Sequence, residues 1–167
     1  MLKNIVKYLT LIILSILVSA NGLNCAMQEA LTLNKGLELA CEDGNIVKVR
    51  ELIDQGMNIN ATNRRGDTAL MRACILNQLE IVKLLLDRGA NTEIKNMSEY
   101  TALTIAFGCH NLEITALLLD HGANINTQDN LGRTALIRAA RSDSIEMVIL
   151  LFTYNPDWEI RDAEGRG

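Results

Sequence analysis

Apolar and polar positions recur along this chain at a fixed interval of 33 residues. Leucines keep this interval at two places in each unit: Leu70, Leu103 and Leu136, and Leu52, Leu85, Leu118 and Leu151. Three further sets keep it too: Thr68, Thr101 and Thr134; Gly56, Gly89 and Gly122, followed by Asn155; and Ala40, Ala73, Ala106 and Ala139. Because independent sets share one period, the sequence predicts a repeat architecture.

The segment from residue 66 to 96 shows how each unit is expected to fold. Thr68 is suited to cap a helix, since its hydroxyl can accept from an unpaired backbone N–H, and that helix should run over about 69–76. A turn near Asn77 leads into a second helix over about 79–88, whose apolar side chains nearly encircle it, so it must be packed on several sides. Gly89 should end that helix in the left-handed conformation. A polar stretch, 90–96, then turns back toward the next threonine.

These motifs resemble the ankyrin-repeat family. The matching segments are Thr68-Ala69-Leu70-Met71 with its counterparts at 101–104 and 134–137, and Leu84-Leu85-Leu86-Asp87-Arg88-Gly89-Ala90 with its counterpart at 117–123. The resemblance implies an all-α solenoid of about four stacked helix-turn-helix repeats with β-hairpin-like connecting loops. The expected repeats are 35–62, 63–95, 96–128 and 129–161, with the truncated start of a fifth at 162–167.

The chain departs from the family motif at two positions. The family usually has Pro second and His fourth, whereas here Ala is second and Met, Thr or Ile is fourth. Ala is the best helix former, so the architecture should survive. The missing His should remove an inter-repeat hydrogen bond and with it some stability.

The two ends of the array should differ. The first repeat lacks the capping Thr and begins in a polar-flanked helix over about 28–42, as a solvent-facing capping repeat should. The fourth repeat ends in Asn155-Pro156-Asp157, and no C-terminal cap follows. Its second helix carries the apolar run 147–152, part of which should meet water as an exposed patch. A partner could cover that patch, copies could associate through it, or the chain could be a truncated relic of a larger ankyrin protein.

The first twenty residues resemble a signal peptide. Lys3 and Lys7 precede a largely apolar run from Leu9 to Val18, and Val18-Ser19-Ala20 offers small residues for cleavage. The apolar run is shorter than the roughly 20 residues that span a bilayer, which favours cleavage over the alternative of an uncleaved anchor. Residues 21–34 are then a linker and the start of the capping helix. We therefore expect an exported protein, secreted or periplasmic, and by analogy with similar exported proteins it could be directed at a host cell.

Charge and motif content narrow the function classes. The net charge is −4, and without the first twenty residues 14 basic residues face 20 acidic ones, which disfavours nucleic-acid binding. No phosphate-binding loop, nucleophile motif or metal-ligand spacing is found, and His110 and His121 are interpreted as solvated loop residues. Asp54, Asp87 and Asp120 follow the repeat and should lie too far apart for acid–base chemistry. We expect no enzyme activity, no cofactor, no metal and no small-molecule substrate.

The cysteines do not suggest a disulfide framework. Cys41 and Cys74 occupy the same position in adjacent repeats, so their backbones should be about 10 Å apart. A disulfide needs Cα atoms within about 7 Å. We interpret both as small core residues, with Cys109 near an exposed rim.

The resemblance implies a binding surface on the concave face, built from loop tips and first helices. The expected partner-binding residues are Arg64, Arg65, Asp67, Ile75, Leu76, Met97, Tyr100, Leu131, Arg133 and Arg141. The wider variable positions also include Ser98, Gly108, Cys109, Asn130 and Ser142. The set holds four Arg and one Asp in an otherwise acidic chain, which predicts a protein partner with an acidic segment and Tyr100 as apolar anchor. A periplasmic housekeeping scaffold is the alternative function.

Overall fold

The computed structural model describes residues 35–142 and 144–167. The predicted signal peptide, 1–20, and the linker, 21–34, lie outside the described residues. A helical segment at 35–42 is followed by seven helices, and from α3 onward they alternate between seven and nine residues. They are α2 (Ile46–Asp54), α3 (Ala69–Ile75), α4 (Leu79–Asp87), α5 (Ala102–Gly108), α6 (Leu112–Asp120), α7 (Ala135–Arg141) and α8 (Ile145–Thr153).

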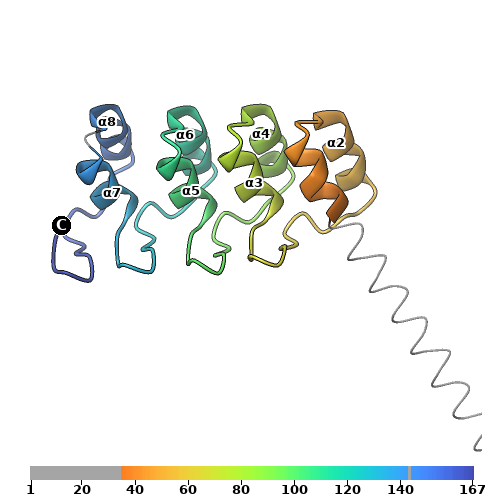
Figure 1. Ribbon diagram of the computed structural model, residues 1–167. Helices are drawn as coiled ribbons and strands as arrows, with labels where there is room; N and C mark the ends of the chain where they lie inside the picture. Colours follow the sequence, from red (N-terminus) through yellow and green to blue (C-terminus); the bar gives the residue numbers. More distant parts are fainter. Residues whose placement is uncertain (1–34, 143) are drawn as a thin grey trace, which may run out of the picture.

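The helices stand in pairs, and the pairs form one row with their connecting loops projecting to the same side (Figure 1). Within a pair α3 packs on α4, α5 on α6 and α7 on α8. Between pairs α3 packs on α5 and α5 on α7, while α4 packs on α6 and α6 on α8. Each repeat therefore touches only its neighbours, and the core runs along the row, as in a solenoid. The predicted stacked helical architecture is confirmed.

The threonines cap the first helices as predicted. The Thr68, Thr101 and Thr134 hydroxyls accept from the backbone N–H groups of Met71, Thr104 and Ile137. The side chains that replace the family His also serve the cap in two repeats, because the Thr68 N–H donates to Met71 Sδ and the Thr101 N–H donates to Thr104 Oγ1. Ile137 has no polar atom, so the fourth repeat lacks this reciprocal bond.

Left-handed residues end the second helices at the predicted places. Gly56, Gly89 and Gly122 have φ values of 85°, 81° and 82°, and Asn155 takes the same role at 52°. The loops that follow turn back on themselves like hairpins, for example where the Asn63 N–H donates to the Asp67 carbonyl. Among the described residues these loops contain no strand, only an antiparallel bridge between Thr62 and Thr68.

Small and apolar side chains fill the space between repeats. Cys41 and Cys74 are fully buried and free, which confirms their interpretation as core residues, and the next repeat has Phe107 at the same position. Burial raises the pKa of the Cys41 thiol to about 12, with the nearby Glu38 and Glu42 carboxylates adding to the effect. Burial raises the pKa of Cys74 as well. Both thiols are therefore protonated and unreactive in the folded chain.

The predicted apolar patch lies at the C-terminal end of the row. Met147 and Leu151 of α8 are buried, whereas Ile149 and Phe152 are exposed. Phe152 is 56% exposed, and Leu119, at the same position one repeat earlier, is only 8% exposed. The outer side of α8 thus has the apolar character of an internal repeat. No helix within the described part of the chain is long and apolar enough to cross a membrane.

Candidate protein-binding face

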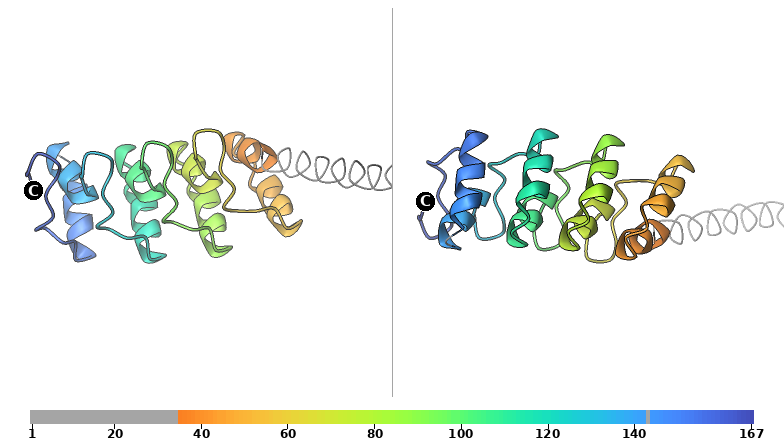
Figure 2. Two further views of the ribbon diagram at one scale, coloured as in Figure 1. Left: turned by 90° about the horizontal axis from the view of Figure 1, so that it is seen from below. Right: turned by 90° about the horizontal axis from the view of Figure 1, so that it is seen from above.

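Four loop tips and the first helices above them form one face of the row, which we call the tip face. It comprises the segments 62–68, 95–101, 128–134 and 161–167 with helices α3, α5 and α7, and it is seen from below in Figure 2. The tip face is built from the loop tips and first helices on which the partner contacts were predicted from the sequence.

Each tip is closed by an Asn or Asp side chain that binds its own backbone. Asn63 Oδ1 accepts from the N–H groups of Arg65 and Asp67, and Asp129 Oδ1 accepts from those of Leu131 and Arg133. The other two tips have the same pair of bonds, made by Asn96 and Asp162. Such turns hold the backbone in a defined conformation. These four residues keep the 33-residue interval, but they were not identified from the sequence.

Backbone hydrogen bonds join the tips in two pairs, and the Lys95 side chain, which donates from Nζ to the Gln128 carbonyl at 3.3 Å, links the second tip to the third. The Met97 N–H donates to the Arg65 carbonyl, and the Ala163 N–H donates to the Leu131 carbonyl, each at 3.0 Å. The tips approach so closely that a Cβ on Gly132 would lie 2.9 Å from the Ala163 nitrogen. The tip face is therefore pre-organised, which lowers the entropic cost of binding a partner.

Most of the predicted contact residues are accessible on the tip face. Seven are exposed: Arg64, Arg65, Ile75, Leu76, Met97, Leu131 and Arg141. Tyr100 and Arg133 are half-buried. Asp67 differs, because it is only 6% exposed and its carboxylate accepts from the Asn96 side chain at 2.8 Å. Its place as a partner contact is corrected: it joins two adjacent repeats, since Asn96 belongs to the next tip.

Two of the arginines share a buried carboxylate. Asp129 Oδ2 accepts from Arg133 Nε at 2.9 Å and from Arg138 Nη1 at 3.2 Å. Burial alone would raise the pKa of Asp129, but the hydrogen bonds from the Arg133 side chain and from the backbone of Arg133 and Leu131 lower it below its usual value. Asp129 is therefore charged at neutral pH, and this one negative charge pairs with two guanidinium groups.

Arg138 is a functional candidate that the sequence analysis did not name. Its guanidinium lies over the Tyr100 ring, 5.5 Å from the centroid, a cation–π arrangement that covers one side of the predicted apolar anchor. Tyr100 is thus part of an Arg–aromatic pair rather than a freely projecting side chain. A closer comparison of repeats two and four would have identified Arg138, because Arg72 occupies the equivalent position.

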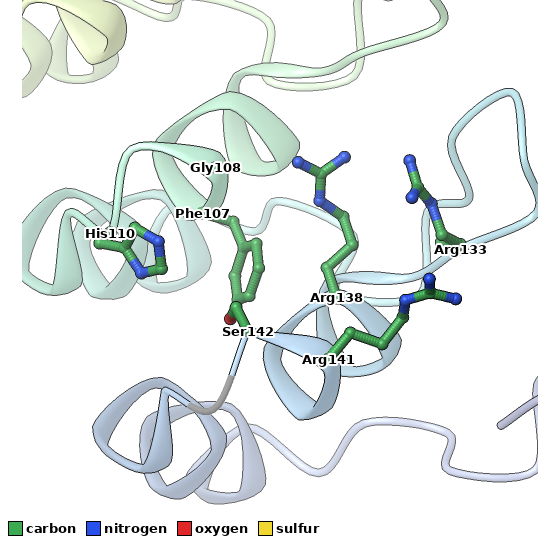
Figure 3. A pocket seen from close by; sticks show the side chains of 7 residues that line it. All are labelled: Phe107, Gly108, His110, Arg133, Arg138, Arg141 and Ser142. Carbon is green, nitrogen blue, oxygen red and sulfur yellow. The ribbon is translucent and has the colours of Figure 1, made fainter.

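A pocket of about 180 Å³ opens between the third and fourth repeats, beside Arg138. Figure 3 shows Phe107 reaching from α5 toward Ser142, with Arg138 and Arg141 rising from α7 and Arg133 from the adjacent tip. Gly108 and His110 complete the lining. Arg141 approaches the carboxylate of Asp162 only loosely, with 3.9 Å between Nη1 and Oδ2. The pocket joins an apolar floor to three cationic side chains.

The two histidines lie at the loop positions predicted from the sequence. His110 lies in the inter-helix turn with φ of 58°, as expected for a loop residue. His121 Nδ1 is 2.8 Å from the Leu117 carbonyl, and its Nε2 is 3.6 Å from Asp87. Among residues 35–142 and 144–167, no group of three or more His, Cys, Asp or Glu is placed to hold a metal ion.

Comparison with known families agrees with the architecture. The family model for ankyrin repeats (3 copies) matches residues 3–96 and 91–162, which together make up most of the chain. No curated protein matched the sequence. Ankyrin repeats are generally protein–protein interaction modules and are typically not enzymes. Given the matched family model, the regular helix pairs and the capped first helices, the chain belongs to the ankyrin-repeat family.

Proposed function

We propose that this protein is a non-catalytic interaction module whose tip face binds an acidic segment of a partner protein. The observation that carries the proposal is the gathering of arginine on this face in a chain of net charge −4. The arginines within the segments and helices that define this face are Arg64, Arg65, Arg72, Arg133, Arg138, Arg141, Arg161 and Arg166. With Lys95 they make nine basic residues, against five acidic ones: Asp67, Glu99, Asp129, Asp162 and Glu164. Because the chain as a whole carries net negative charge, a local cationic surface would determine where an acidic partner docks.

The charge balance on the tip face supports this direction. Asp67 is used in a contact between repeats, and Asp129 is buried beneath Arg133 and Arg138. Arg64 and Arg65 are exposed on the tip of the second repeat. Exposed apolar side chains at Met97 and Leu131, on the next two tips, supply surface that a bound segment can bury. Arginine beside apolar surface is typical of protein-binding sites.

The proposal includes export, with the first twenty residues acting as a signal peptide. Support comes from the sequence: two lysines, a short apolar run and a small-residue cleavage site. Fractionation of cells that express the full chain, followed by mass spectrometry of its N-terminus, tests this part. Export predicts a mature protein outside the cytoplasm that begins near Asn21. A cytoplasmic protein that retains Met1 would contradict it.

A charge-reversal experiment tests the binding part. The full chain is titrated with fluorescein-labelled hexaglutamate, a probe of acidic segments, at low and at physiological salt. Wild-type protein should bind, with an affinity that falls as salt rises. Replacing Arg64, Arg65 and Arg141 by Glu should abolish binding. A matched variant with Lys48, Arg50 and Lys83 replaced by Glu has the same net charge, but its changes lie on α2 and α4. Equal loss of binding in both variants would mean that overall charge, not the tip face, attracts the peptide.

A further inference from the structure

The repeat period allows each junction between repeats to be compared with the others. At the junction of the first and second repeats, Arg72 of α3 donates from Nη2 to Glu42 Oε1 at 2.5 Å. Two periods later the same two positions are Arg138 and Gly108. The intervening junction has apolar residues at both, Ile75 and Ile105. The junction between the third and fourth repeats therefore has the arginine of the first junction but not its carboxylate.

The guanidinium of Arg138 lies next to the place where that missing side chain would begin. A Cβ built on Gly108 would be 3.1 Å from Arg138 Nη2, closer than ordinary van der Waals contact, so the end of the Arg138 side chain must shift by a few tenths of an ångström to admit a side chain there. Gly108 is the last residue of α5, and its φ is not in the left-handed region, so the backbone does not require glycine there. The absence of a side chain opens the pocket above Phe107.

The carboxylate that lies near Arg138, that of Asp129, already accepts four hydrogen bonds. Asp129 accepts two backbone N–H groups through Oδ1 and both arginines through Oδ2. A guanidinium has five N–H donors, so two of them present many more donors than one carboxylate can accept. Arg141 adds a third guanidinium to the same pocket, 49% exposed at its side chain.

We infer that this pocket receives a carboxylate side chain, Asp or Glu, from the bound segment, at the position that Glu42 fills beside Arg72. The inference rests on the proposed function and assigns one acidic residue of the partner to one place on the tip face. The incoming carboxylate accepts hydrogen bonds from Arg138 Nη2 and from the Arg141 guanidinium. The methylene groups of that Asp or Glu side chain lie against Phe107. Charge-assisted bonds of this kind are the strong class of protein hydrogen bonds.

The full chain with Gly108→Glu tests the pocket directly, because it supplies the missing carboxylate from within the array. We expect the introduced carboxylate to form a salt bridge with Arg138, and the variant to have a melting temperature at or above that of the wild type. Affinity for labelled hexaglutamate should fall about tenfold or more, a change that corresponds to the loss of one strong contact. The control Gly108→Gln has nearly the same bulk without charge and should lose much less.

The outcomes separate the pocket from the tip face as a whole. If Gly108→Glu and Gly108→Gln bind hexaglutamate equally, the pocket is not a carboxylate site, although the charge reversal at Arg64, Arg65 and Arg141 can still show binding to the face. If wild-type protein does not bind the peptide, both proposals fail. A peptide with one phosphoserine among neutral residues is compared with the same peptide carrying Glu. Much tighter binding of the phosphoserine peptide would overturn the carboxylate assignment in favour of a phosphoryl group.

Discussion

The Tyr154 hydroxyl donates a hydrogen bond of 2.8 Å to the carboxylate of Asp120, across the junction between the third and fourth repeats. The two preceding junctions use the same aspartate position with other partners, Arg88 on Asp54 and His121 on Asp87. The regularly spaced aspartates therefore link each second helix to the next repeat. At the last junction the hydrogen bond to Asp120 raises the pKa of Tyr154.

A double-mutant cycle should measure this link. Tyr154→Phe removes the hydroxyl, and because the pair is exposed we expect a loss of about 0.5–1 kcal/mol in the free energy of unfolding. Asp120→Asn and the double variant complete the cycle, with urea denaturation as the measurement. If the two single losses simply add in the double variant, the hydrogen bond contributes nothing to stability.

Stability should depend on pH through Asp129. Its pKa is lowered in the folded chain, so its contribution is present above the unfolded pKa of about 4 and is lost as pH falls through the lower, folded value. Asp129→Asn is a suitable variant, because Asn63 and Asn96 make the same tip in other repeats. We expect the variant to melt below the wild type at pH 7.

The difference in melting temperature between wild type and Asp129→Asn should shrink as the pH is lowered from about 5 toward about 3, the range in which an aspartate with a lowered pKa loses its contribution. Scanning calorimetry across this range gives the measurement. Asp162 also has a lowered pKa, from hydrogen bonds with the backbone and side chain of Arg166, but it is common to both proteins and cancels in the comparison. A difference independent of pH would show that the charge of Asp129 does not stabilise the fold.

Side-chain truncation at one position of the repeat should lower the free energy of unfolding by different amounts in the third and fourth repeats. Leu119 is buried between repeats, so Leu119→Ala should cost about 2–4 kcal/mol. Phe152 occupies the same position in the fourth repeat but is largely exposed, so Phe152→Ala should cost less than about 1 kcal/mol. Chemical denaturation at several protein concentrations gives both values. A large, concentration-dependent loss for Phe152→Ala would instead show that copies associate through the α8 end.

Thiol labelling should distinguish the described cysteines. In a Cys25→Ser background, a maleimide at neutral pH should modify exposed Cys109 within minutes and leave Cys41 and Cys74 unmodified until the chain unfolds. Their burial excludes the reagent and raises both thiol pKa values. Mass spectrometry counts the labels with and without urea. Rapid labelling of all three thiols in native buffer would contradict the packed interior.

The helices were predictable because their boundaries depend on local signals. Thr68 and Gly89 act within a few residues of themselves, so a period visible in the sequence translates directly into capped, terminated helices. The burial of Asp67 was not predictable in this way. It depends on Asn96, a residue of the next tip, and on how closely the two tips approach.

The charge pattern of the tip face needed three-dimensional geometry for a similar reason. Arg133 and Arg138 lie four and nine residues after Asp129, on a tip and on a helix, and only the fold brings them to one carboxylate. The vacant position at Gly108 becomes visible only when the Glu42–Arg72 contact is known to exist. The positions that the family resemblance places on the binding face indicated a cationic surface, and the structure identified which cations share a counter-charge.

Side-chain NMR of the arginines can show which of them an acidic segment contacts. The full chain, labelled with ¹⁵N, is titrated with hexaglutamate while the guanidinium Nε–H signals are followed. We expect shifts that saturate at Arg64, Arg65, Arg138 and Arg141, with Arg50 on α2 unchanged. A shift confined to Arg50, or no saturable shift at any arginine, would contradict an acidic-segment site on the tip face.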